Sequence, residues 1–226
     1  MVNDSHLICE QVEAAFREIL PVEFSVESHH ADASLPTPVC EHDIVKNSVP
    51  KRVAEFIGGR WCAHAALTDA GAVSHGILKG PFGEPLWPDN VIGSITHESR
   101  ICAAAVSTSD RYSAVGIDIV DTQRNFECDR NLFSLITSPQ DTLTIIGCEF
   151  SLQMKYMLFF SIKESVVKIL SPLLSCYLDL REIVVTITPG GFSAKLNGRD
   201  PVITGHWKNC GTYLLSCALL AKQDIP

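Results

Sequence analysis

Residues 160–168 of the chain read FSIKESVVK. The apolar residues of this stretch recur at helical spacing, so it is predicted to be a helix that docks through an apolar stripe. Glu164 and Lys168 are four positions apart, which places an acid and a base on one face of that helix. A pair at this spacing is also typical of an ordinary solvated helix face, so the pair alone does not define a site.

About forty positions earlier, residues 115–120 read VGIDIV. These residues favour a strand, and strand alternation puts Gly116, Asp118 and Val120 on one face. A carboxylate on a buried strand needs a partner, because burying an isolated charge is costly. Asp118 is therefore either part of a strand-end turn, a satisfied buried acid, or a metal ligand.

One arrangement satisfies the charges of both stretches. A divalent cation held between Asp118 and Glu164 would neutralise the two carboxylates, with Lys168 and Lys163 nearby for phosphate. Lys168 shares the helix face of Glu164, whereas Lys163 is turned by about 100° from it. A metal and phosphate site is therefore one interpretation of these residues, and in it Lys168 is the better placed of the two lysines.

The order and spacing of these stretches resemble the paired signatures of the 4'-phosphopantetheinyl transferases, which read G-I-D-x-E and then S/C-x-K-E-x-x-x-K. Val120 stands where that family has its second acid. Residues 51–63, KRVAEFIGGRWCA, resemble the basic helix of the siderophore-associated and actinobacterial branch. Residues 77–97 contain ILKG, GEPLWP and GSITH, which are similar to its coenzyme A segment. The four blocks follow the family's order.

The resemblance implies transfer of the phosphopantetheine arm of coenzyme A to a serine of an apo acyl, peptidyl or aryl carrier protein, releasing adenosine 3',5'-bisphosphate. By position in the motif, Asp118 and Glu164 would hold Mg²⁺ on the pyrophosphate. Glu164 would also take the proton of the carrier serine, directly or through a water on the metal. Lys168 and Lys163 would offset phosphate charge. The pathway implied is siderophore or other nonribosomal peptide or polyketide synthesis.

The coenzyme A contacts implied by the resemblance lie in the first half of the chain: Arg52, Arg60, Lys79, Thr96 and His97. Arg52 and Arg60 are eight positions apart, so on a helix both could face one extended ligand. Without the neighbouring blocks, the two arginines would be typical of a solvated helix face, and His97 of an ordinary hydrogen-bonded histidine.

Composition limits the class of protein. The chain has 226 residues, 46% of them hydrophobic, and a net charge of −8, which argues against nucleic-acid binding. Its nine cysteines are scattered without a zinc spacing, which predicts reduced thiols. No signal peptide or membrane span is expected, so we predict a cytoplasmic protein. We also expect it to be a monomer.

The predicted fold class is α+β, with two similar α+β halves that form the pseudo-twofold fold of the resembled family. Residues 1–112 are expected to carry the coenzyme A segments, and residues 113–226 the metal and catalytic motifs. Helices are expected over 7–20, 48–67 and 149–170, the last stopped by Pro172, with a loop over 28–50. Strands are expected over 91–95, 101–107 and 113–119, followed by an antiparallel meander over 182–188, 192–196, 201–207 and 212–220.

Two other functions remain open at this stage. Val120 would fit a coenzyme A-binding protein of the same fold that has lost its activity, although active short members of the superfamily also read D-I-V here. A structural or interaction domain is the second alternative, and the co-occurrence of four blocks opposes it. The sequence does not identify the carrier protein.

Overall fold

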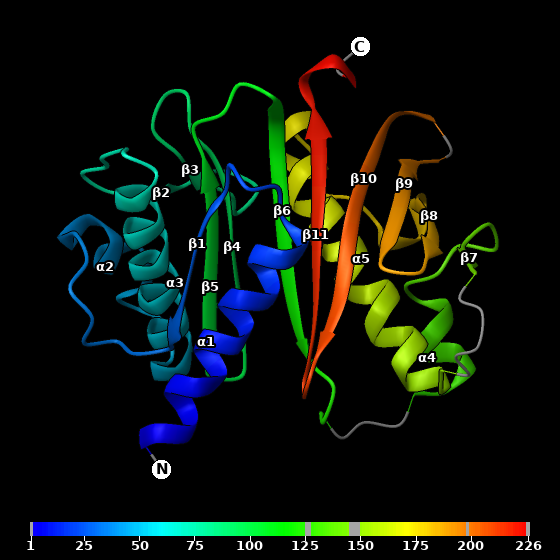
Figure 1. The fold of residues 1–226 in the computed structure, drawn as a ribbon, viewed down its shortest axis with the longest axis horizontal. Coiled ribbons are helices and arrows are strands. Elements are labelled where there is room, and N and C mark those ends of the chain that lie inside the picture. Colours follow the sequence, from blue (N-terminus) through cyan, green and yellow to red (C-terminus); the bar gives the residue numbers. More distant parts are fainter. Residues whose placement is uncertain (1, 125–127, 145–149, 198, 225–226) are drawn as a thin grey trace. The chain divides into compact units, whose positions relative to one another are not determined.

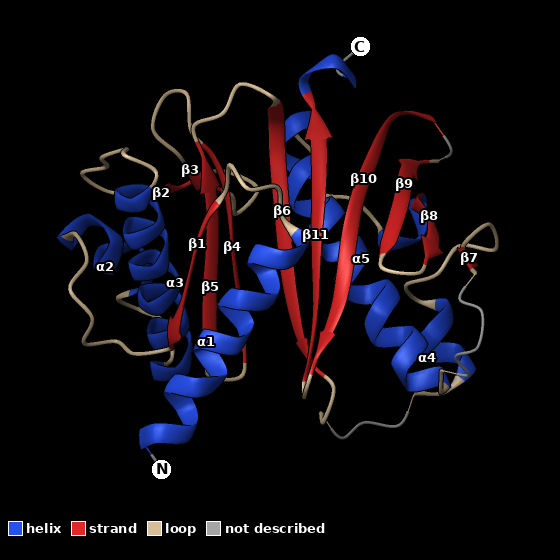
Figure 2. Cartoon of the chain, viewed as in Figure 1, coloured by secondary structure: helices blue, strands red, loops and turns tan. Residues whose placement is uncertain are grey.

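The computed structural model describes residues 2–124, 128–144, 150–197 and 199–224. The chain divides into two compact units, Met1–Asp110 and Arg111–Pro226. Figure 1 follows the chain through both units, and Figure 2 marks their helices and strands. In the described part of the chain, no helix is both long enough and apolar enough to cross a membrane.

The first unit contains a three-stranded antiparallel sheet with the order β1-β5-β4 and a separate two-stranded ribbon, β2-β3. Its elements are α1 (Val2–Ile19), β1 (Ser25–His30), α2 (Val39–Val45), α3 (Pro50–Asp69), β2 (Leu78–Lys79), β3 (Pro85–Leu86), β4 (Ile92–Glu98) and β5 (Ile101–Ser107).

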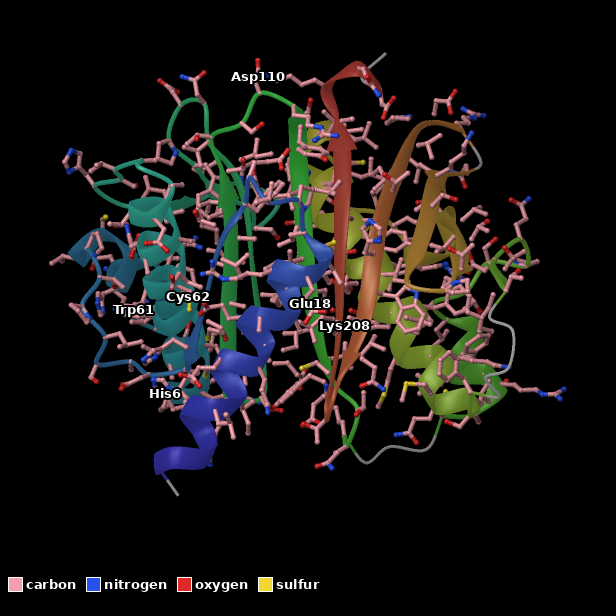
Figure 3. The ribbon with its side chains drawn as sticks, in the orientation of Figure 1. His6, Glu18, Trp61, Cys62, Asp110 and Lys208 are labelled. Carbon is pink, nitrogen blue, oxygen red and sulfur yellow. The ribbon has the colours of Figure 1, made fainter. Side chains whose placement is uncertain are left out.

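Small side chains let helix α3 lie close to the sheet of the first unit. Every residue of β5 is buried, and α3 meets it through buried positions that include Cys62 and Ala63. A Cβ built on Gly58 would lie 2.9 Å from the Sγ of Cys102, so a larger residue would push the helix away. Trp61, labelled with Cys62 on α3 in Figure 3, packs its ring against His29 of β1.

The second unit contains a six-stranded sheet with the order β6-β11-β10-β9-β8-β7, antiparallel except for the short β7-β8 pair. Its elements are β6 (Tyr112–Asp121), α4 (Arg130–Ser134), β7 (Thr142–Leu143), α5 (Leu152–Leu174), a 3₁₀ turn (Leu180–Glu182), β8 (Ile183–Thr188), β9 (Gly191–Leu196), β10 (Arg199–Cys210), β11 (Tyr213–Ala221) and a last 3₁₀ turn (Lys222–Asp224). Helix α5 packs on β6 and β11 and buries an apolar stripe there.

The α+β class and the C-terminal meander are confirmed, since β8, β9, β10 and β11 pair with their successive neighbours. The loop expected over 28–50 is wrong in part, because α2 forms within it and packs on α3. Pro172 does not stop α5, which continues to Leu174. Ser175 ends the helix in the left-handed conformation. Glu149, the expected start of this helix, lies outside the described residues.

Candidate active site

The candidate site of the second unit depends on a close approach between strand β6 and helix α5. A Cβ built on Gly116 would lie 1.9 Å from the carbonyl oxygen of Ser165 and 3.3 Å from the Cβ of Lys168. A side chain at position 116 would therefore separate the helix from the strand. Because Gly116 faces α5, strand alternation also directs Asp118 and Val120 toward the helix.

Asp118 and Lys168 meet across this contact. The Nζ of Lys168 donates to Oδ1 of Asp118 at 3.0 Å and to the carbonyl oxygen of Ile117 at 2.6 Å. Asp118 is only 8% exposed, so the pair is largely shielded from solvent. The structure thus brings together two of the residues predicted from the motifs, and it places the ammonium beside the strand that carries the acid.

Glu164 lies one helical turn before Lys168, on the same half-buried row of α5. Burial raises the pKa of the Glu164 carboxyl, the negative charge of Asp118 raises it further, and Lys168 lowers it. The three predicted residues therefore form one electrostatically coupled group. The raised pKa makes the Glu164 carboxylate a better proton acceptor than an ordinary glutamate.

Two buried serines support this group from the sheet. Ser216 of β11 is the direct cross-strand partner of Asp118 and is fully buried. The hydroxyl groups of Ser216 and Ser161 are 2.9 Å apart, and the Ser216 hydroxyl also donates to the carbonyl oxygen of Ser161. Ser161 is the serine of the predicted motif, so its role in this structure is to fix α5 against β11 beside the acid.

The structure does not support the phosphate contact predicted for Lys163. Its side chain is 0% exposed, and its Nζ donates to Oδ2 of Asp141 at 2.6 Å and to the carbonyl oxygen of Leu180 at 3.1 Å. Burial lowers the pKa of the Lys163 ammonium, while Asp141 opposes that shift. Because Lys163 is turned away from the row of Glu164, it points into the core and joins α5 to the Asp141 loop.

In the first unit, Arg52 and His97 are in direct contact. Nη1 of Arg52 donates to Nε2 of His97 at 2.8 Å, so the proton of a neutral His97 ring is on Nδ1. That nitrogen lies 3.7 Å from Oε2 of Glu55. Lys51 also lies 3.7 Å from the same carboxylate. Glu55 was not predicted as a site residue, although its spacing of three and four positions after Arg52 and Lys51 is a visible signal.

Arg60 belongs to the same region but is itself buried. The guanidinium groups of Arg52 and Arg60 lie 6.0 and 4.6 Å from the ring of Phe56, so the two arginines do share a helix face. Arg60 is 4% exposed, and its Nε donates to the carbonyl oxygen of Ile77 at 2.8 Å. Burial lowers the pKa of Arg60 to about 10, which leaves it cationic at neutral pH.

The other two predicted coenzyme A contacts differ in exposure. Lys79 is exposed on β2, directly after the backbone that Arg60 holds. Thr96 is only 2% exposed, because it occupies an inward position of β4, next to the outward His97. The side chain of Thr96 therefore does not lie at the surface with Arg52, Lys79 and His97, and the structure does not support a ligand contact from it.

The carboxylates of the second unit suit a cation whose remaining ligands are oxygens of water and substrate. In the described residues, no three His, Cys, Asp or Glu side chains form a metal cluster, so the chain offers two carboxylates, Asp118 and Glu164. Their charges oppose each other, because the charge of Asp118 adds to the burial that raises the pKa of Glu164. Mg²⁺ is commonly bound through one or two carboxylates plus substrate phosphates and water. These residues fit that ion.

Comparison with known proteins gives the family. A model of the 4'-phosphopantetheinyl transferase N-terminal domain matches residues 40–107, and a model of the 4'-phosphopantetheinyl transferase superfamily matches residues 114–218. The chain is 34% identical to 4'-phosphopantetheinyl transferase Svp of Streptomyces mobaraensis over 165 residues, which cover 71% of this chain and 66% of that protein.

Two further relatives agree with this match. Identity to 4'-phosphopantetheinyl transferase Npt of Nocardia iowensis is 32% over 183 residues, or 79% of this chain and 80% of that protein. Identity to enterobactin synthase component D of Escherichia coli K12 is 29% over 141 residues, or 59% of this chain and 66% of that protein. The predicted family is thereby confirmed, and the chain belongs to the 4'-phosphopantetheinyl transferase superfamily.

Proposed function

We propose that this protein transfers the 4'-phosphopantetheine arm of coenzyme A to a serine of an apo carrier protein and releases adenosine 3',5'-bisphosphate. The observation that carries the proposal is the coupled group of Asp118, Glu164 and Lys168 on β6 and α5. A carrier protein or carrier domain of siderophore, nonribosomal peptide or polyketide synthesis is the proposed acceptor.

Glu164 is the proposed base of this reaction. Its carboxyl group is half-buried, its pKa is raised by burial, and it occupies the same helix row as the cation Lys168. In the transfer, the serine hydroxyl oxygen forms a bond to the β-phosphorus of coenzyme A as the bond to the α-phosphate breaks, and Glu164 accepts the hydroxyl proton. Lys168 offsets the negative charge that moves to the departing phosphate.

Asp118 and Glu164 would hold Mg²⁺. The ion supplies charge neutralisation on the pyrophosphate, as in other phosphoryl transfers. Lys168 also bonds to Oδ1 of Asp118. Binding of the metal therefore requires Asp118 to share its charge between two cations, which is consistent with an ion that binds together with the phosphates of the co-substrate.

Arg52, Lys79 and His97 are the proposed coenzyme A contacts of the first unit. Arg52 and His97 form one surface pair beside Glu55, and Lys79 extends from the ribbon held by Arg60. Coenzyme A carries a 3'-phosphate and a pyrophosphate, which are the groups that such cations recognise.

Incubation with coenzyme A, Mg²⁺ and a panel of apo-carrier proteins, read by intact mass, tests the proposal. We expect a phosphopantetheine-sized gain on at least one carrier, and EDTA should abolish it. Glu164→Gln should lower turnover more than coenzyme A affinity, whereas Lys79→Ala should mainly lower affinity. Lys168→Met should lower turnover, because it removes the cation that offsets charge on the departing phosphate. Lys155→Met, which removes a positive charge elsewhere on α5, is its matched control and should retain turnover. Bound coenzyme A without mass gain on any carrier would leave a binding protein that has lost its activity.

A further inference from the structure

Glu41 is a buried acid that the proposed chemistry does not use. It lies on α2, is 0% exposed, and was not singled out from the sequence. Its Oε1 accepts two hydrogen bonds, one from the backbone N–H of Ile77 at 2.7 Å and one from Nε2 of His64 at 2.8 Å. A fully buried carboxylate is costly, so its partners indicate what it holds in place.

Arg60 binds the carbonyl groups of the same backbone segment. Its Nε donates to the carbonyl oxygen of Ile77 at 2.8 Å, and its Nη2 lies 3.4 Å from the carbonyl oxygen of Leu78. Ile77 is thus held at both its N–H and its carbonyl group by side chains of opposite charge. The next residue along the chain after Leu78 is Lys79, whose side chain is exposed.

The charges of Glu41 and Arg60 also support each other. The negative charge of Glu41 raises the pKa of Arg60, which burial has lowered. Among the described residues, Oε2 of Glu41 is buried and has no hydrogen-bond partner. A buried carboxylate oxygen without a hydrogen-bond partner destabilises the fold unless another interaction compensates. Here the attraction between the Glu41 charge and the buried Arg60 guanidinium provides that compensation.

We infer that Glu41 is a positioning residue for coenzyme A: with Arg60 it clamps the backbone of Ile77 and Leu78, and thereby fixes Lys79 for its phosphate contact. This inference rests on the proposed function, because Lys79 is a coenzyme A contact only there. The exposed β2-β3 ribbon has two residues in each strand, so its own hydrogen bonds supply little rigidity. The clamp anchors the ribbon at the residues directly before Lys79.

Two conservative variants of Glu41 distinguish the effect of its side-chain length from the effect of its negative charge. Glu41→Gln keeps an oxygen at the same distance and removes the charge, so it should keep the Ile77 hydrogen bond. Glu41→Asp keeps the charge but is shorter by one methylene, so it should lose that bond. We expect Glu41→Asp to raise the Kd and the KM for coenzyme A by about tenfold with kcat within about twofold of wild type, and Glu41→Gln to remain within about threefold in both constants.

The effect must also pass through Lys79. In a Lys79→Ala background, Glu41→Asp should weaken coenzyme A binding by less than about twofold further. Asp43→Asn, which removes an exposed carboxylate from the same helix, is the matched control and should bind as wild type does. Additive losses in the double variant, or a Glu41→Gln protein that binds worse than Glu41→Asp, would overturn the inference.

Amide hydrogen exchange of residues 76–80 in the full chain without ligand distinguishes failure of the clamp from failure of the proposed function. Exchange should be faster in Glu41→Asp than in wild type, Glu41→Gln and Asp43→Asn. If wild type binds no coenzyme A, the proposed function fails, the coenzyme A part of the inference fails with it, and exchange alone decides the backbone clamp. Equal exchange in all four proteins would overturn the clamp even if coenzyme A binds.

Discussion

Helix α5 approaches strand β6 so closely at Ser165 that a Cβ on Gly116 would lie 1.9 Å from the Ser165 carbonyl oxygen. This contact explains why a glycine precedes the acid of the first motif by two positions. It brings the strand that carries Asp118 against the helix that carries Lys168, whose ammonium bonds to both Asp118 and the Ile117 carbonyl oxygen. The site is therefore a consequence of backbone packing, and the side chains only complete it.

Gly116→Ala should destabilise the second unit and impair the site together. The added methyl group must displace a backbone oxygen, and overpacking of this kind costs about 1–3 kcal/mol. Urea unfolding should show that loss, and turnover should fall because Lys168 moves away from Asp118. Gly191→Ala is the matched control, because its Cβ would meet only ordinary contacts of 3.5 Å or more. If Gly116→Ala leaves stability and turnover unchanged, the close approach does not position the site.

The buried pair of Lys163 and Asp141 should respond asymmetrically to mutation. Lys163→Met leaves Asp141 with backbone donors from Ser138 and Val185, at 2.7 and 2.8 Å. Asp141→Ala leaves a buried ammonium with the Leu180 carbonyl oxygen and also removes the acceptor of both N–H groups. We expect the free energy of unfolding to fall by about 3–5 kcal/mol for Asp141→Ala and by less for Lys163→Met. Chemical denaturation measures both.

The burial of Lys163 also predicts that this residue does not contact coenzyme A. Since Lys163 is fully enclosed, folded Lys163→Met should bind coenzyme A with an affinity within about twofold of wild type. Lys79→Ala, an exposed lysine change, should weaken binding clearly under the same calorimetric conditions. A large loss of affinity in Lys163→Met would restore the phosphate role.

These residues show where sequence reasoning succeeded and where it stopped. The i, i+4 spacing placed Glu164 and Lys168 on one helix face, and strand alternation placed Asp118 on one face of its strand, because both are local periodicities. The resemblance to the family's paired motifs was needed to join the two stretches into one site. The partner of Lys163 lies 22 positions away in a loop, so only the tertiary fold could reveal it. The helix α2 has seven residues, which is too short for a periodic signal, and Glu41 was missed with it.

Pro172 shows a different limit. A proline normally ends a helix because it lacks an N–H and its ring crowds the preceding turn. Here it lies in the last turn of α5, where only one helical hydrogen bond is lost, and the N–H groups of Ser175 and Cys176 close the end on Pro172 and Ser171. The proline is tolerated because it lies in the last turn of the helix, and the sequence pattern did not specify where that last turn would be.

The pH dependence of stability in the first unit should involve Glu27 on β1. Burial, the charge of Glu13 and a hydrogen bond that protonated Glu27 donates to Asp69 raise the pKa of Glu27 to about 7, while Arg17 lowers it. The folded protein therefore binds more protons than the unfolded chain between about pH 4.5 and 7. The stabilisation is fully present below the unfolded pKa and is lost as pH rises through the folded pKa.

Glu27→Gln should remove this dependence, because a glutamine cannot ionise and its amide group can donate to Asp69. Thermal unfolding between pH 5 and 8 should show wild type losing stability relative to the variant as pH rises. Glu18→Gln, which changes an exposed acid of α1 in the same unit, should keep the wild-type slope. Parallel curves for wild type and Glu27→Gln would show that Glu27 does not titrate in this range.

Substitutions of Val120, whose apolar side chain lies on the same strand face as Asp118, test the proposed metal site. Val120 is 6% exposed and pairs with Leu214 of β11. Val120→Glu and Val120→Gln should both lower the Tm in EDTA, because burying an unpartnered polar group costs about 1–3 kcal/mol. Mg²⁺ should restore the Tm of the glutamate variant and not that of the glutamine variant, since only a carboxylate can join Asp118 and Glu164 as a ligand of the ion.

The glutamate variant should also reach half-maximal rate at a lower Mg²⁺ concentration. Equal responses of the two variants to Mg²⁺ would show that position 120 does not face the ion, and an unchanged Mg²⁺ response in Asp118→Ala would remove the metal site itself.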